Sequence, residues 1–218
     1  NPGWPAEEYD YAIRAAAASN LCTVGCGTLL DALDLYMYDS NATNINHVGH
    51  RRWMLNPRQR KCGFAWGKEV TAYLAHDASR QNTPPWDVVC FPPRGYMPLR
   101  YFRKHREKDY VFKNQGYAWH VGFNPERYAA PTPAIDVKVF ALDENYRPQG
   151  HALTLDHFSV SALSLGDGGA VIFRPANVEI ADGKRYGVLL TGLRWKDGTS
   201  APALAYVVEF AAIGDEYK

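Results

Sequence analysis

The chain has 218 residues, of which 46% are hydrophobic and 22% charged, so it has the composition of a globular protein and not of a disordered, collagen-like or coiled-coil chain. Its 24 Lys and Arg nearly balance 23 Asp and Glu, and a formal charge of +1 gives no overall field that would attract nucleic acid. No apolar run approaches the ~20 residues that a membrane-spanning helix needs. We therefore expect one large domain or two small ones, with no nucleic-acid partner and no membrane span.

The first 80 residues carry helical patterns. Pro5 and the acidic residues after it suit the first turn of an Ala-rich helix. Leu29, Leu33 and Met37 recur at helical spacing. A further short helix is stopped by Asn56-Pro57. The predicted elements are helices over 6–18, 28–39 and 49–55, a polar loop over 40–46, and strands over 62–66 and 70–75.

Beyond a Pro-rich passage the helical pattern gives way to short strand candidates separated by Gly-rich turns. Over 135–139 apolar residues alternate with charged ones, as a half-buried strand requires. These strands predict a small β-sandwich with Trp119 in its core, and the basic cluster over 100–108 is expected to be a solvated loop. The predicted strands are 118–123, 135–142, 157–162, 170–173, 186–191 and 203–211.

The chain contains four cysteines, Cys22, Cys26, Cys62 and Cys90. An even number fits two disulfides formed in an oxidising compartment, with three pairings open. The alternative is that some or all of them are buried free thiols. The sequence does not choose between these two readings.

The segment 47–57 is the densest in potential chemistry, because it holds two histidines beside two arginines. Histidine titrates near neutral pH and can bind metal, shuttle protons or donate hydrogen bonds. A zinc site needs about three protein ligands, and His47 with His50 supplies at most two. The flanking Trp53 and Trp66 are expected to lie in a core rather than to line a groove.

Several short motifs together resemble the bacterial CAP proteins, the cysteine-rich secretory, antigen 5 and pathogenesis-related 1 group, also called the SCP domain. Gly49-His50-Arg51 is followed by Leu55-Asn56-Pro57 and then by Cys62-Gly63-Phe64, in the order of the family signature. Ser19-Asn20-Leu21 resembles the family's Gly-Glu-Asn element, and Tyr36 to Asp39 resembles a characteristic helix end.

The resemblance implies an α+β protein in two parts. Residues 1–82 would be a CAP/SCP-like α-β-α sandwich, and 83–218 a β-sandwich, because 91–98 resembles the join to a β-rich C-terminal domain in some bacterial members. Since a CAP domain typically takes ~150 residues, we expect this chain to begin inside that fold and to leave a helix or sheet face uncovered. The family is secreted, so an extracellular location is expected.

The resemblance also implies a polar cleft formed by two histidines and two acidic residues, sometimes with a bound divalent cation. His50 matches the second histidine and Asp39 one of the acidic residues, while Ser19 replaces the other. A divalent metal such as zinc is left open, and no metal ligand is assigned. The predicted site comprises His50 and Asp39 as catalytic residues, with His47, Arg51, Ser19 and Asn20 on the ligand side.

Three functions remain open from the sequence. The first is a non-enzymatic binding protein whose cleft around His50 holds a small lipid-like, hydrophobic or peptide ligand. The second is a hydrolase that uses His50 and Asp39 in the same cleft, with or without a metal. The third is a structural surface module whose β-sandwich makes protein or glycan contacts. Whether the protein is an enzyme is therefore undecided, because fold does not fix function.

Overall fold

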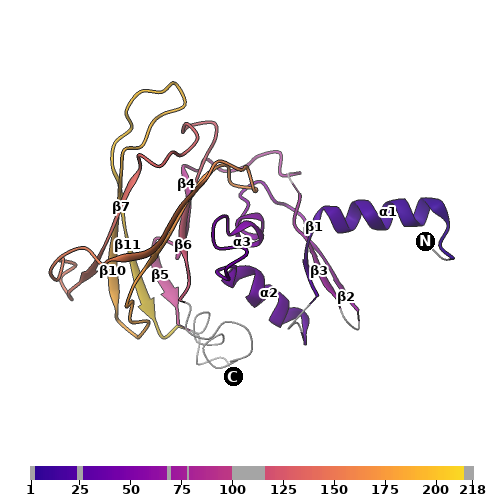
Figure 1. Ribbon diagram of the computed structural model, residues 1–218, viewed down its shortest axis with the longest axis horizontal. Coiled ribbons are helices and arrows are strands. Elements are labelled where there is room, and N and C mark those ends of the chain that lie inside the picture. The colour runs from indigo at the N-terminus through magenta and orange to yellow at the C-terminus, as the bar shows by residue number, and fades with distance from the viewer. Residues whose placement is uncertain (1–2, 24–26, 68–69, 78, 100–115, 214–218) are drawn as a thin grey trace.

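The computed structural model describes residues 3–23, 27–67, 70–77, 79–99 and 116–213, so the basic cluster at 100–108 lies outside the described residues. Within these ranges the chain is of the α+β class, with three helices and eleven strands arranged in three sheets (Figure 1). None of the described helices has the length and apolar character needed to cross a membrane.

The first sheet is small and antiparallel, with β3 (Thr71–Leu74) between β1 (Ser19–Cys22) and β2 (Gly63–Trp66). Its strands alternate between two faces, and the buried face carries Thr71 and Tyr73 of β3. The sequence predicted β2 and β3 but not β1, which follows directly on a helix.

Helices α2 (Leu29–Tyr38) and α3 (Gly49–Met54) lie between this sheet and the rest of the molecule (Figure 1). The side chain of Thr28 caps α2 by accepting a hydrogen bond from the backbone N–H of Asp31 at 3.1 Å. The helix ends at Asp39, whose φ of 40° places it in the left-handed region and turns the chain away.

Helix α1 (Ala6–Ala17) projects from the opposite side of the three-stranded sheet (Figure 1). None of its residues is buried, and Tyr11 and Ile13 are 69% and 53% exposed. A 12-residue helix gains little stability by itself in water, since most helical stability in proteins comes from packing. Helices therefore lie on both sides of the sheet, but α1 leaves its own side largely uncovered.

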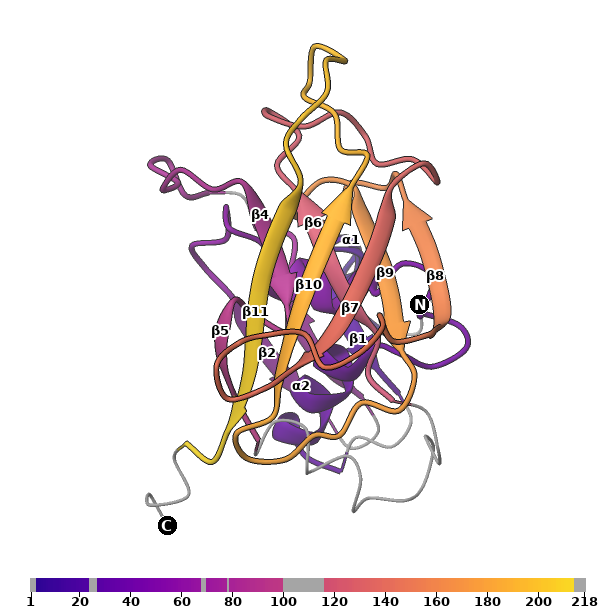
Figure 2. The same cartoon turned by 90° about the vertical axis from the view of Figure 1, so that its left-hand side faces the viewer.

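The remaining strands form two four-stranded sheets that pack face to face as a β-sandwich (Figure 2). One sheet has the order β5-β11-β10-β7 and the other β4-β6-β9-β8. All pairs are antiparallel except β5 with β11. The strands are β4 (Val88–Phe91), β5 (Gly95–Pro98), β6 (Trp119–Phe123), β7 (Asp136–Leu142), β8 (Leu155–Ser161), β9 (Ala170–Pro175), β10 (Arg185–Thr191) and β11 (Leu204–Ala211).

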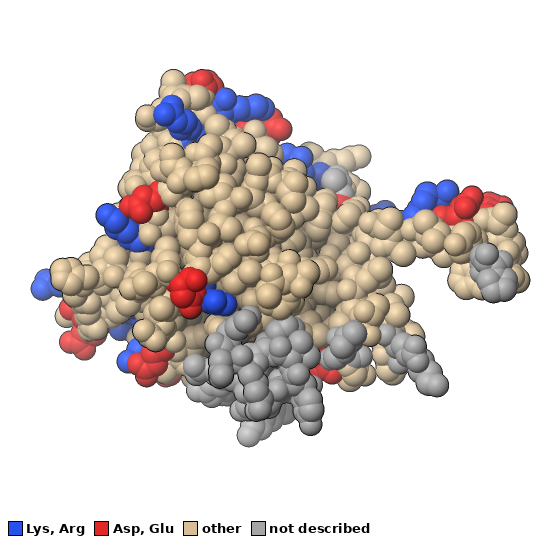
Figure 3. Space-filling model, viewed as in Figure 1, with Lys and Arg blue, Asp and Glu red and all other residues tan. Residues whose placement is uncertain are grey.

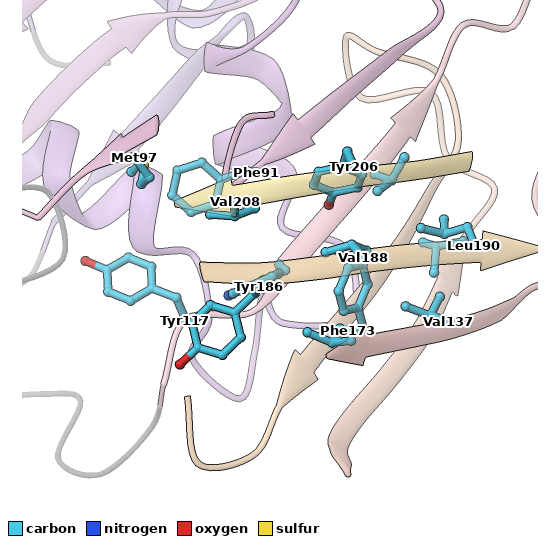
Figure 4. Packing of buried hydrophobic residues seen from close by; sticks show 14 of the residues in the cluster. Phe91, Met97, Tyr117, Val137, Phe173, Tyr186, Val188, Leu190, Tyr206 and Val208 are labelled. Atoms are coloured by element: carbon cyan, nitrogen blue, oxygen red, sulfur yellow. The ribbon is translucent and has the colours of Figure 1, made fainter. Parts of the chain in front are cut away.

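The main hydrophobic core lies between these two sheets (Figure 4). Trp119 and Phe173 from one sheet meet Tyr186 and Val188 from the other, and Trp119 is 1% exposed as the sequence predicted. Tyr38 at the end of α2 belongs to the same cluster, so the core extends beyond the sandwich into the helices. Strand β6 is buried on both faces, and beside it Ile45 and Val48, from the turn before α3, pack with Ala118, Ala170 and Ile172.

Two details differ from what the sequence predicted. Trp66 is 69% exposed at the edge of the first sheet, whereas a core position was expected; Trp53 is half-buried and its ring lies 3.9 Å from that of His76. Strands β4 and β5 were not predicted, since prolines surround both. The predicted boundary at residue 82 falls in the segment between β3 and β4.

The cysteines combine parts of both expectations. Cys22 is disulfide-bonded, whereas Cys62 and Cys90 are free thiols, the first exposed and the second half-buried. The two-disulfide framework allowed by the even number of cysteines is therefore reduced to a single bond. Burial raises the pKa of the Cys90 thiol above its ordinary value.

Candidate functional site

His50 and Asp39, which the sequence placed in one cleft, lie side by side. The Nδ1 atom of His50 is 2.9 Å from Oδ1 of Asp39. Helix α3 carries the histidine, and the left-handed turn at the end of α2 directs the carboxylate toward it. The Asp39 side chain is only 1% exposed, while that of His50 is 34% exposed. The pair thus has a buried carboxylate behind a partly accessible ring.

Two neighbours hold the histidine in place. The ring of Tyr36 on α2 stacks on the imidazole, with 5.6 Å between the ring centroids. Its hydroxyl donates to the backbone carbonyl of Asn20 at 3.0 Å, and Nδ2 of Asn20 donates to the carbonyl of His50 at 3.0 Å. Asn20, predicted on the ligand side, is 3% exposed, so its amide fixes the backbone of the motif.

The electrostatics of the pair favour a charged histidine. A carboxylate only accepts hydrogen bonds, so the Nδ1 atom of His50 carries a proton and donates it to Asp39. This hydrogen bond raises the pKa of His50 above its ordinary value, although burial of the ring opposes the effect. Nε2 of His50 has no hydrogen-bond partner among the residues that the structure describes.

Arg51, also predicted on the ligand side, is fully buried. Its guanidinium donates to the carbonyls of Met37 at 2.6 Å and Ala118 at 2.6 Å, and also to that of Tyr38. Burial lowers its pKa to about 10, so it stays charged near neutral pH. Arg51 therefore has no surface with which to contact a ligand; instead it ties α2 to Ala118, the residue before β6, through backbone carbonyls.

The neighbouring Arg52 is equally buried, and sequence reasoning gave it no role. Its Nε donates to Oδ1 of Asp167 at 2.8 Å, and its NH2 group donates to the carbonyls of Leu163 at 2.7 Å and of Gly168. All three acceptors lie in the loop between β8 and β9. The only sequence signal for this arrangement is the run of two arginines inside a short apolar helix.

His47 and Ser19, the other predicted ligand residues, lie outside the His50–Asp39 pair. His47 is exposed just before α3, and its Nδ1 is 3.1 Å from Oγ of Ser161 on β8. Ser161 also accepts a hydrogen bond from Arg52 at 3.2 Å. The hydroxyl of Ser19 donates to the carbonyl of Ala15 at the end of α1 at 2.7 Å.

Among the residues that the structure describes, neither a serine nucleophile nor a set of three metal ligands meets the pair. Ser40, the nearest serine in sequence, is fully buried; its hydroxyl donates to Tyr38 and accepts from the N–H of Ala118 at 2.9 Å. Within the described residues no group of three or more His, Cys, Asp or Glu side chains could hold a metal ion. His50 and Asp39 supply two ligands, whereas a catalytic zinc needs about three protein ligands.

Comparison with known proteins adds no relative to this picture: no protein-family model, no curated protein sequence and no solved structure matches the chain.

Proposed function

We propose that the chain is a secreted binding protein of the CAP/SCP class, in which the His50–Asp39 pair recognises a small apolar or peptidic ligand. The exposure and orientation of the His50 ring support this proposal most directly. The ring is one-third exposed, it is oriented by a buried carboxylate, and its Nε2 atom is left without a protein partner among the described residues.

The class assignment rests on the family-like motifs and on where they lie. The Gly-His-Arg element begins α3, which follows the helix that carries Asp39. Asn20 of the Ser-Asn-Leu element contacts the backbone of His50. Three segments that resemble one family's signature are thus in contact around a single histidine.

The chemistry of the pair fits a hydrogen-bond acceptor on the ligand. With Nδ1 held by Asp39, protonation of His50 adds an N–H at Nε2, which can donate to a carbonyl or a carboxylate. The raised pKa of His50 extends this charged form to higher pH. Ligand binding that uses this donor should weaken as pH rises through the pKa of His50.

A second candidate is a hydrolase, which the same 2.9 Å contact between His50 and Asp39 favours. In its neutral form His50 has a lone pair at Nε2 that can take a proton from water, while Asp39 orients the ring and stabilises the imidazolium that forms. This activity requires the neutral ring, so it should increase with pH, opposite to the binding described above.

Both candidates can be tested with defined probes. Acetylated tripeptides with a free carboxylate and a fluorescent fatty acid would be titrated into the wild type, His50→Gln and the control His151→Gln, which changes an exposed histidine after β7. We expect one probe class to bind the wild type and the control but to lose roughly tenfold or more in affinity with His50→Gln. Equal affinity for all three proteins removes the His50 site from the proposal. If peptides are cleaved in a reaction that depends on His50 and becomes faster as pH rises, the hydrolase function is correct and the binding function is wrong. If no probe is bound or cleaved, both are wrong and the structural surface module is the remaining function.

A further inference from the structure

Arginines gather along an open groove at the junction of the two halves of the chain. Two hollows adjoin here and share Pro84 in their walls. One is lined by Arg60 and Arg80, and the other by Arg58 and Arg127 together with the side of Trp86. We call this feature the arginine groove; it is defined by Arg58, Arg60, Arg80, Pro84, Trp86 and Arg127.

Each half of the chain orders its own wall of the groove through hydrogen bonds. The N–H of Arg80 donates to the carbonyl of Arg58 at 3.2 Å, which pins the segment after β3 to the segment after α3. Nδ2 of Asn124, in the loop after β6, donates to the carbonyl of Trp86 at 2.7 Å. Each of these contacts orders one wall of the groove through backbone or buried amide groups, independently of any ligand.

The cations of the groove are only partly neutralised. Arg127 pairs with Asp87, and the Glu126 carboxylate binds Lys196 at 2.9 Å while it stays 3.9 Å from Arg58. Arg60 and Arg80 form no ion pair within the described part of the chain.

The Asp77 carboxylate lies beside the backbone of Arg60 and is engaged by backbone donors. Asp77 accepts the backbone N–H groups of Arg60 at 2.7 Å and Lys61 at 2.8 Å, and these hydrogen bonds lower its pKa to about 2. Its charge therefore persists, but its Oδ2 atom is taken up by backbone donors. On the face shown in Figure 3, Lys and Arg lie in small groups beside Asp and Glu. Two arginines that line one hollow and have no ion-pair partner among the described residues are thus a local feature in a protein of net charge +1.

We propose that the arginine groove binds an acidic glycan, a chain of sugars that carries carboxylate groups. A guanidinium presents parallel N–H donors that match a carboxylate, so Arg60 and Arg80 suit acidic substituents. The amides of Gln81 and Asn82, which line the same hollow, can hydrogen-bond to sugar hydroxyls, and Trp86 and Pro84 provide apolar surface for a sugar ring. An open groove that runs over two hollows fits an extended chain rather than a compact molecule.

A nucleic acid fits this groove less well. Single strands bind by stacking their bases on exposed aromatic rings. Here Trp86 is the one aromatic residue among the described ones that lines the two hollows, and the nearby Trp195 is covered by Tyr128, with 4.9 Å between ring centroids, and by Arg127, 5.7 Å from its ring centroid. No aromatic ladder along the groove is left for bases to stack on within the described residues.

The test compares two double variants that remove the same charge. Arg60→Gln/Arg80→Gln changes the groove, and Lys138→Gln/Arg147→Gln changes exposed cations on and after β7. Binding of oligogalacturonate, a uronic-acid chain, would be measured by calorimetry, with neutral dextran oligosaccharide and single-stranded DNA as comparison ligands. Thermal unfolding of each variant shows that it folds.

We expect oligogalacturonate to bind the wild type and the control alike, and the groove variant to bind roughly tenfold or more weakly. Higher salt should reduce the affinity of the wild type, since exposed charges are screened. The proposal is overturned by absent binding, by equal loss in both double variants, by dextran binding as well as the acidic chain, or by DNA binding more tightly through the same arginines. His50→Gln should leave this binding unchanged, so its outcome is separate from that of the site at His50.

Discussion

Nε of Arg52 lies 2.8 Å from Oδ1 of Asp167, and both side chains are fully buried. The pair joins helix α3 to the loop between β8 and β9, across 115 positions in the sequence. Gly122 makes room for it, since a Cβ at that position would lie 1.9 Å from Oδ2 of Asp167. The buried ion pair therefore connects the helical half of the chain to the β-sandwich, and it does so one residue away from Arg51.

Breaking this pair should destabilise the whole molecule. Arg52→Met leaves the Asp167 carboxylate buried without its cation, and the loss of one partner from a buried ion pair typically costs about 3–5 kcal/mol. Urea unfolding at pH 7 measures the change. Lys138→Met is the control, because Lys138 and Asp136 form an exposed pair at 3.6 Å that should contribute less than ~1 kcal/mol. Equal effects of the two substitutions would contradict the role given to Arg52.

His120 should make the protein sensitive to mild acid. It is fully buried 3.7 Å from Asp167, and neither of its ring nitrogens has a hydrogen-bond partner within the described residues. Burial lowers its pKa to about 4, and the nearby cations Arg51 and Arg52 act in the same direction, against Asp167. An unfolded histidine titrates near ~6.5, so the unfolded state binds more protons and stability falls as pH drops from ~6.5 to about 4.

The size of this effect follows from the shift in the pKa of His120, which corresponds to on the order of 3 kcal/mol. His120→Gln removes the titration, so the difference in unfolding free energy between pH 7 and pH 4.5 should be smaller in the variant than in the wild type. Because both proteins share every other titrating group, comparison of the two differences isolates His120. The same pH dependence in both would show that His120 does not titrate abnormally.

Sequence patterns predicted the elements that local periodicity defines. The spacing of Leu29, Leu33 and Met37 predicted α2, and alternation over 135–139 predicted β7. Strand β1 was missed because it follows directly on a helix, and β4 and β5 because prolines surround them; each of these strands gains its hydrogen bonds from distant partners. Short strands of this kind are determined by tertiary pairing, which a local pattern does not contain.

The candidate site, like the fold, was predicted where local sequence carries a signal and missed where distant residues decide the contacts. His50 and Asp39 are 11 positions apart, and their motif-like surroundings indicated that they meet. Arg51 was placed on the ligand side because it belongs to the family-like Gly-His-Arg element, yet in the structure it is buried and its guanidinium binds backbone carbonyls. The partner of Arg52 lies 115 positions away in a Gly-rich turn, where no local signal distinguishes Asp167 from an ordinary turn aspartate.

The thiols should show two reactivities and one disulfide. Cys62 is exposed and should react rapidly with a thiol reagent in the native protein, whereas the half-buried Cys90, with its raised pKa, should react slowly until the protein unfolds. Reduction should then release the thiols of the disulfide that contains Cys22. Intact mass after alkylation counts the modified cysteines at each stage. Two free thiols before reduction are expected; none would restore the two-disulfide framework.

Asp39 should control the charge of His50 and should also stabilise the buried cation of Arg51. Its Oδ1 binds Nδ1 of His50, and its Oδ2 accepts the backbone N–H of Arg51 at 3.3 Å, next to the fully buried guanidinium of that residue. Asp39→Asn is the informative substitution, because asparagine tolerates the left-handed backbone at φ 40° while it removes the charge. The pKa of His50 should fall toward its ordinary value, as measured by NMR titration of the imidazole.

The same substitution should destabilise the protein, because the buried Arg51 cation loses its neighbouring carboxylate, by about 1–3 kcal/mol. The size of the loss should depend on pH. The folded-state pKa of His50 is raised, so the stability that His50 gains from Asp39 is fully present below its unfolded pKa of ~6.5 and disappears as pH rises through the folded pKa. Asp39→Asn should therefore cost more stability at pH 5.5 than at pH 8.5, whereas Asp136→Asn, an exposed change on β7, should cost little at either pH. A loss that is independent of pH would mean that Asp39 acts through Arg51 alone and does not raise the pKa of His50 in the native protein.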